Sequence, residues 1–136
     1  MHIIGIDPGL YGAIAFLDDT GARVEDMPVA GGRIDPYNLA HLLTLDGHKV
    51  CVIEDVHAMP AQGVSSSFNF GRSQGIIIGV AAALGYSIQF VSPSKWKKAF
   101  GLSKDKDLSR RKAIELFPSL AQALSRKKDE GRAEAL

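Results

Sequence analysis

An acidic residue at the end of an apolar, β-branched run constrains this chain more than any other feature. Residues 3–7 read Ile-Ile-Gly-Ile-Asp, Pro8 and Gly9 follow, and a second apolar run begins after Gly12. This pattern predicts two strands joined by a tight turn, with Asp7 inside an otherwise apolar stretch. A charge on a core strand costs several kcal/mol unless something compensates it. Asp7 is therefore interpreted as a ligand of a bound cation, with a plain turn cap as the alternative.

A second carboxylate stands in the same setting. Residues 50–56 read Val-Cys-Val-Ile-Glu-Asp-Val, which is another short buried-strand pattern ending in acid. Neighbouring strands lie about 4.8 Å apart, so two such acids can chelate one hard divalent ion through oxygen. Strand alternation sends Glu54 and Asp55 to opposite faces. We predict that Glu54 joins Asp7, because it directly follows Ile53 while Asp55 begins the exit from the strand.

Length and composition indicate one globular domain over residues 1–136. The chain is 46% hydrophobic and 23% charged, and no apolar stretch reaches the roughly 18 residues that a membrane span needs. Its single cysteine, Cys51, allows no internal disulfide, so a cytoplasmic setting is expected. The net charge of +1 conceals an asymmetry, since residues 1–91 sum to −5 and residues 92–136 to +6. This basic third suggests a polyanionic partner beside the cation site, with a solvated helix face as the alternative.

The order of apolar patterns and turn signals predicts a mixed α/β fold. Strands are expected at 2–7, 12–18, 22–28, 49–55 and 87–91. Helices are expected at 36–43 with Asp35 as N-cap, from a serine cap at 65–67 to 84, and at 95–100, 107–117 and from 129 onward. Residues 30–33 are expected to form a loop. In the last helix Glu130 and Glu134 share a face one turn apart, and Asp129 can reach forward from the cap position.

Together these segments resemble the RuvC family of Holliday junction resolvases, within the ribonuclease H-like superfamily, and particularly the resolvase-like proteins of phages. The resemblance rests on Gly5-Ile6-Asp7-Pro8-Gly9 and on Ile53-Glu54. It continues in order through Ser67-Phe68-Asn69-Phe70-Gly71-Arg72-Ser73-Gln74-Gly75, Val91-Ser92-Pro93-Ser94-Lys95-Trp96-Lys97-Lys98, Asp105-Lys106 with Ser109-Arg110, and Lys128-Asp129 with Arg132-Ala133-Glu134-Ala135-Leu136.

The resemblance implies a central five-stranded mixed sheet, three antiparallel strands and then two parallel ones, flanked by helices. It also implies a homodimeric, metal-dependent endonuclease that cuts four-way DNA junctions in a bacterial or phage-infected host cell. It further implies two Mg²⁺ ions held by four acids: Asp7, Glu54, Asp129 and Glu134. Mn²⁺ is expected to substitute for Mg²⁺. Lys106 would lie close to the scissile phosphate. Further DNA contacts are implied for Phe68, Phe70, Arg72, Lys95, Lys97, Lys98 and Arg110.

The sequence departs from the family pattern near its last acid. Many members carry an acid or a histidine three residues before that acid, where this chain has Gly131. Asp129 and Glu130 therefore compete as the fourth ligand: the phage-type resemblance favours Asp129, and helical spacing favours Glu130. The comparable helix would also be expected to continue beyond Leu136.

Two further expectations concern assembly and function. The predicted helix over 68–84 is apolar on more than one face, so one side is expected to pack on the sheet and the other on a second copy. The alternatives to a junction resolvase are a less selective branched-DNA or flap endonuclease of the same fold, and a DNA-binding module without turnover.

Overall fold

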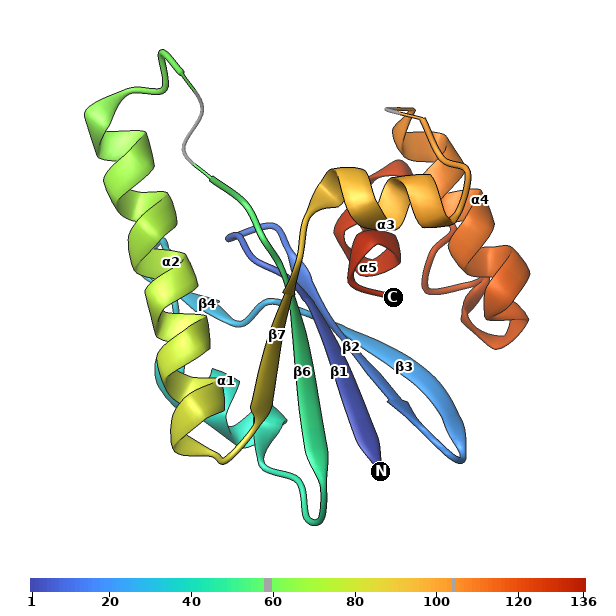
Figure 1. The fold of residues 1–136 in the computed structure, drawn as a ribbon, viewed down its shortest axis with the longest axis horizontal. Coiled ribbons are helices and arrows are strands. Elements are labelled where there is room, and N and C mark those ends of the chain that lie inside the picture. Colours follow the sequence, from blue (N-terminus) through green and yellow to red (C-terminus); the bar gives the residue numbers. More distant parts are fainter. Residues whose placement is uncertain (58–59, 104) are drawn as a thin grey trace.

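A five-stranded mixed sheet forms the centre of the molecule, in the order β3-β2-β1-β6-β7 (Figure 1). The structure is a computed structural model that describes residues 1–57, 60–103 and 105–136. β1 pairs antiparallel with β2 and β2 with β3, whereas β6 runs parallel to β1 and β7 parallel to β6. The predicted sheet is thus confirmed. Its strands are β1 (His2–Asp7), β2 (Ala13–Asp18), β3 (Gly21–Asp26), β6 (Lys49–Glu54) and β7 (Ser87–Val91).

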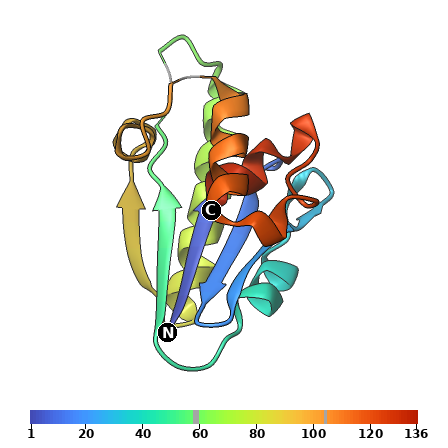
Figure 2. The same ribbon diagram turned by 90° about the vertical axis from the view of Figure 1, so that its right-hand side faces the viewer.

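Helices cover both faces of this sheet. On one face α1 (Pro36–Leu43) and α2 (Val64–Ala83) enclose the main core with inward residues of β1 and β6. α3 (Pro93–Ala99), α4 (Lys106–Leu116) and α5 (Glu130–Ala135) lie on the other side. Figure 2 shows this arrangement, with α2 behind the sheet and the C-terminal segment in front of it. The main core includes Ile4, Ile6, Ile14, Phe16, Cys51 and Ile53 from the strands and Leu39, Leu43, Ile77 and Ala81 from the helices.

Local capping signals fix the ends of several helices. Asp35 Oδ1 accepts hydrogen bonds from the backbone N–H groups of Tyr37 (3.0 Å) and Asn38 (3.2 Å), and Pro36 opens α1 as predicted. Gly85 follows the C-terminus of α2 with φ +77°, a conformation that glycine adopts at no steric cost. These ends were readable because each depends on residues only a few positions apart.

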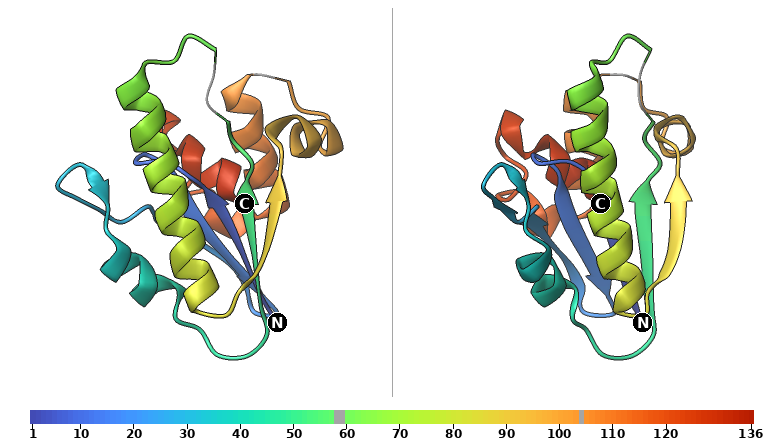
Figure 3. Two further views of the ribbon diagram at one scale, coloured as in Figure 1. Left: turned by 60° about the vertical axis from the view of Figure 1, so that its left-hand side comes forward. Right: turned by 90° about the vertical axis from the view of Figure 1, so that its left-hand side faces the viewer.

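Two predicted details are wrong. α2 begins at Val64 with Gly63 as its N-cap, so no serine caps it. The segment expected as a loop contains a small hairpin of β4 (Val29–Ala30) and β5 (Arg33–Ile34), which lies beside α2 (Figure 3). Its two turn residues, Gly31 and Gly32, have φ +58° and +70°, which is the requirement of a tight two-residue hairpin turn.

Two short 3₁₀ helices, η1 (Pro118–Leu120) and η2 (Lys127–Asp129), complete the path from α4 to α5. Among the helices of the described ranges, none combines the length and the apolar character that crossing a bilayer would require.

Candidate active site

Asp7 and Glu54 end neighbouring parallel strands. β1 and β6 are in register up to the pair Ile6–Ile53, and Asp7 and Glu54 are the next residue of each strand. Because Ile6 and Ile53 point into the main core, strand alternation turns both acids to the opposite face. Neighbouring strands are about 4.8 Å apart, so the two carboxylates share one end of the sheet. Asp55 lies beyond β6, where its Oδ2 is 3.5 Å from His57 Nε2.

Two glycines let α5 lie directly on this face. A Cβ placed on Gly131 would be 2.8 Å from the carbonyl oxygen of Tyr11 and 3.1 Å from Asp7 Oδ2. A Cβ on Gly5 would overlap the carbonyl oxygen of Ala135. Any side chain at position 131 would therefore push α5 away from Asp7. The departure from the family pattern at Gly131 thus coincides with an unusually close contact between α5 and the end of β1.

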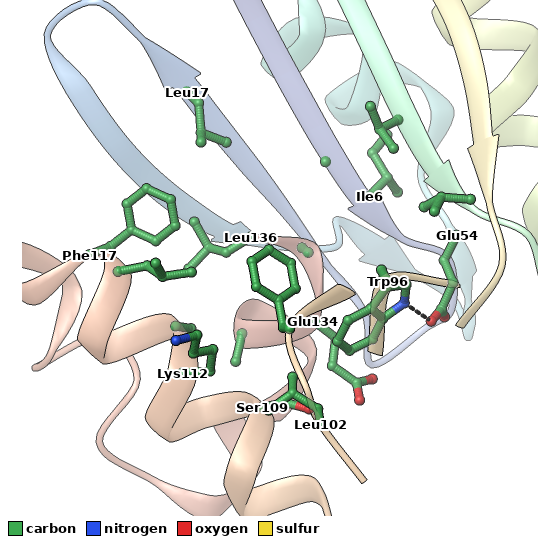
Figure 4. A pocket seen from close by; sticks show the side chains of 18 of the residues that line it. Ile6, Leu17, Glu54, Trp96, Leu102, Ser109, Lys112, Phe117, Glu134 and Leu136 are labelled. Atoms are coloured by element: carbon green, nitrogen blue, oxygen red, sulfur yellow. Dashed lines mark hydrogen bonds between the residues drawn. The ribbon is translucent and has the colours of Figure 1, made fainter. Parts of the chain in front are cut away.

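Glu134 of α5 lines the same cavity as Glu54. This cavity, about 290 Å³ in volume, lies between the sheet and α3, α4 and α5, and most of its lining is apolar. In Figure 4 the Glu54 and Glu134 carboxylates both lie at the end of the cavity beside Trp96. Trp96 Nε1 donates a hydrogen bond of 3.0 Å to Glu54 Oε1, and Lys97 Nζ lies 3.5 Å from Glu134 Oε1. The acids are thus held by neighbouring side chains of α3.

The side chain of Asp129 is 2% exposed and faces Arg126. Its Oδ2 accepts hydrogen bonds from the backbone N–H (2.8 Å) and Nε (3.1 Å) of Arg126, and its Oδ1 accepts one from Nη2 (2.8 Å). These hydrogen bonds hold the pKa of Asp129 below its usual range. The expectation that this carboxylate reaches forward into α5 is wrong, because it reaches back to close η2.

A second arginine attaches α5 to the far strand of the sheet. Arg132 donates from Nε to Asp26 Oδ1 (2.7 Å) and from Nη2 to Asp26 Oδ2 (2.9 Å), a bidentate pair between α5 and β3. Its Nη1 also donates to the carbonyl oxygen of Ala123 at 3.1 Å. The Arg132 guanidinium lowers the pKa of Asp26. α5 is therefore fixed both by close backbone packing and by this ion pair.

The donors that gather on this face suit a hard divalent cation. They are carboxylates, whose oxygens are the ligands that Mg²⁺ prefers, and they come from β1, β6 and α5. Among the described residues, however, no three acidic, histidine or cysteine side chains are close enough to hold one ion together. The backbone positions of Asp7, Glu54 and Glu134 nevertheless bring these three acids to the same end of one face of the sheet.

The predicted DNA-contacting residues are spread around this end of the molecule. Lys95 and Lys98 are exposed on α3, whereas Lys97 turns towards Glu134. Arg110 Nη1 donates to the carbonyl oxygen of Ser125 and Nη2 to Asp107, both at 3.0 Å. Lys106 begins α4, but its side chain lies outside the described part of the structure.

The predicted aromatic contacts lie on the first turns of α2. Phe68 is 67% exposed and Phe70 is half-buried. The Arg72 guanidinium lies 5.7 Å from the centre of the Phe68 ring, and its Nη2 donates to Asn69 Oδ1 at 3.0 Å. In Figure 1 this end of α2 extends beyond the carboxyl ends of β1 and β6.

Trp96, Arg126 and Arg132 are site features that the sequence analysis missed. In the sequence Trp96 appears only as part of the segment from Val91 to Lys98 that carries the family resemblance. A signal for Trp96 existed. Its helix follows a strand that runs parallel to β6, so this helix must begin at the carboxyl ends of the strands, where Glu54 lies. The pair of Arg132 with Asp26 gave no comparable signal in the sequence, whereas Arg126 and Asp129 have the three-residue spacing of a local ion pair.

Comparisons with known proteins concern the sequence and the fold of the chain. No family model matches the chain. The chain is 29% identical to the chloroplastic Holliday junction resolvase MOC1 of Chlamydomonas reinhardtii over 118 residues, which are 85% of the chain. The chain spans only 13% of the length of that relative.

Two solved structures share the fold. Thermus thermophilus RuvC matches with a TM-score of 0.64 at 15% identity, covering 95% of this chain and 92% of the other. T. thermophilus RuvC in complex with a Holliday junction substrate matches with a TM-score of 0.60 at 14% identity, covering 99% and 91%. The sheet order, the helical layers and these alignments agree, and the chain has the fold of RuvC.

Proposed function

We propose that this chain is a divalent-metal-dependent endonuclease that resolves four-way DNA junctions by paired, symmetric hydrolysis of phosphodiester bonds. The observation that carries this proposal is that Asp7, Glu54 and Glu134, on three different elements, lie at one end of one face of the sheet. The fold shared with RuvC supports it, as does the likeness to a relative named as a Holliday junction resolvase.

In this proposal the carboxylates of Asp7, Glu54 and Glu134 would hold two divalent ions. Ions held there would activate a water for in-line attack and stabilise the leaving 3′ oxygen. Trp96 orients Glu54 through its indole N–H, and Lys97 keeps a positive charge beside Glu134. The exposed lysines of α3 bind backbone phosphates, and Lys106 is proposed beside the phosphate that is cut.

The fourth ligand is proposed to be Asp129, with Glu130 as the alternative. Asp129 would have to exchange its three hydrogen bonds with Arg126 for a metal ion. Glu130 lies one helical turn before Glu134 and so shares its face. Titration of Mn²⁺ into the Asp129→Asn and Glu130→Gln variants separates the two, since affinity falls in the variant that has lost a ligand.

A second copy of the chain is proposed to pack on the outer face of α2. Gly71, Gly75 and Gly79 are exposed there, and an added Cβ at any of them would meet nothing within 4 Å. Their spacing of four residues places them on one face, in line with the exposed Val64 and Phe68. Glycine allows close approach of another backbone, and a two-fold axis through this stripe would present two equivalent sites for two symmetric cuts.

The test replaces one acid of the site and one acid beside it. Asp7→Asn is expected to abolish Mg²⁺-dependent cutting of a four-way junction and to leave junction binding nearly unchanged, since the variant loses a ligand and keeps the fold. Asp55→Asn is the matched control, because Asp55 lies beyond β6 next to His57. Equal cutting by wild type and Asp7→Asn, or no cutting by wild type, would refute the nuclease proposal.

Comparison of DNA shapes separates the related functions. A resolvase cuts a four-way junction at paired positions and leaves plain duplex intact. Comparable cutting of flaps, forks and junctions would instead indicate the less selective endonuclease, and binding without any cutting would indicate the DNA-binding module.

A further inference from the structure

The turn that follows Asp7 presents a fully exposed aromatic ring. Tyr11 is 96% exposed and lies four residues after Asp7, between β1 and β2. The backbone around it is tightly fixed. The N–H of Gly12 donates to the carbonyl oxygen of Gly9 (3.2 Å), and the carbonyl oxygen of Gly12 accepts from Met27 (3.0 Å). The turn is thus a rigid support for a ring that the fold itself leaves in solvent.

This turn also lies against the helix that carries Glu134. The carbonyl oxygen of Tyr11 and the Oδ2 of Asp7 both approach the Cα of Gly131, to the point that a Cβ there would lie 2.8 Å and 3.1 Å from them. The backbone of Tyr11 is therefore packed beside the proposed metal ligands. The turn is thus a neighbour of the position at which the proposed function would bind DNA.

We infer that Tyr11 stacks on a base next to the phosphodiester bond that is cut, an inference that rests on the proposed function. A tyrosine ring has only two side-chain torsions, so ordering it on a base costs little entropy. Every base presents a π-face, and stacking on an aromatic side chain contributes about 1–3 kcal/mol per base, or roughly 5- to 150-fold in affinity. Tyr11 would act from the β1–β2 turn, on a different element from Phe68.

Binding of a four-way junction measures this contribution directly. Wild type, Tyr11→Ala, Tyr11→Phe and Tyr11→Trp are compared in EDTA, which prevents cutting, on junctions carrying 2-aminopurine beside the cut position. Tyr11→Ala is expected to bind roughly 5- to 150-fold more weakly and to lose the fluorescence change of the stacked base. The phenylalanine and tryptophan variants keep a π-face and are expected to bind like wild type.

Tyr37→Ala provides the control, because Tyr37 is also exposed (71%) but lies on α1, where its ring contacts His41. This variant is expected to bind like wild type. Equal binding and fluorescence of Tyr11→Ala and wild type would overturn the inference, as would a loss in Tyr11→Phe as large as in Tyr11→Ala. Wild type that fails to bind or cut junctions would refute the proposed function first, so the two failures are distinguishable.

Discussion

At the scale of single residues, the indole of Trp96 controls how Glu54 is presented. Its N–H donates to Glu54 Oε1 at 3.0 Å across 42 positions of sequence. Groups that orient a metal ligand contribute about 10- to 100-fold to metal affinity or activity. Trp96→Phe keeps an aromatic ring in the cavity and removes the donor. We expect its Mn²⁺ affinity and junction cutting to fall within that range, measured by titration and single-turnover kinetics.

The accompanying measurement is the melting temperature of Trp96→Phe. A value near that of wild type would assign the loss to the orientation of Glu54. Unchanged metal affinity in this variant would show that the hydrogen bond has no part in the site.

Gly131 is the second decisive residue, because only a hydrogen atom fits between α5 and the Asp7 turn. A methyl group at this position meets backbone atoms that cannot rotate away. We expect Gly131→Ala to lower the free energy of unfolding by about 1–3 kcal/mol, a typical cost of overpacking, and to weaken Mn²⁺ binding as α5 moves away.

Gly63→Ala is the control for that substitution. Gly63 has φ −61° and open space around its Cα, so an alanine there clashes with nothing and loses only the preference for glycine at the N-cap of α2, about 0.5–1 kcal/mol, with Mn²⁺ binding unchanged. Urea unfolding of the two variants gives the comparison, and equal stability of Gly131→Ala and wild type would contradict the close packing of α5.

At the scale of elements, the ion pair between Arg132 and Asp26 ties α5 to β3. Because Arg132 lowers the pKa of Asp26 in the folded chain, this carboxylate stabilises the fold above its unfolded pKa of about 4. That contribution is lost as the pH falls below 4 and through the lower folded pKa. Asp26→Asn is expected to be less stable than wild type at neutral pH and to approach wild type as the pH falls through the lowered pKa of Asp26.

Urea unfolding across this pH range checks the sign. Asp46→Asn, at an exposed position in the loop before β6, is expected to follow wild type at every pH. A constant difference between Asp26→Asn and wild type over the whole range would contradict the assignment to ionisation of Asp26.

At the scale of the whole molecule, the proposed dimer depends on how closely a second copy can approach α2 at Gly71, Gly75 and Gly79, the glycine stripe. Gly75→Leu projects a bulky side chain from an open position, so the isolated fold is expected to be as stable as wild type or more so. In the proposed dimer the same side chain meets the partner's backbone, and we expect a shift to monomer in sedimentation equilibrium. Ser65→Leu, exposed outside the stripe, is expected to leave the association state unchanged.

Much of the fold is readable from the sequence. The strand ending in Asp7, the parallel strand ending in Glu54 and the Asp35 cap of α1 were predicted within a few residues of their observed bounds. Each depends on side-chain alternation or on hydrogen bonds between near neighbours. Alternation also sends Glu54 and Asp55 to opposite faces, and the register of β1 with β6 decides that Glu54 shares a face with Asp7.

Tertiary structure alone decided the partners of Asp26 and Glu54. Arg132 reaches Asp26 across 106 positions and Trp96 reaches Glu54 across 42, distances over which no sequence period carries information. The direction of Asp129, back to Arg126, is by contrast a local contact over three residues that closes η2. The sequence thus determined the sheet and which acids lie on its ends, because those follow from local periodicity. The packing of α5 through Gly5 and Gly131 determined how closely they approach, because that depends on contacts between backbones far apart in the chain.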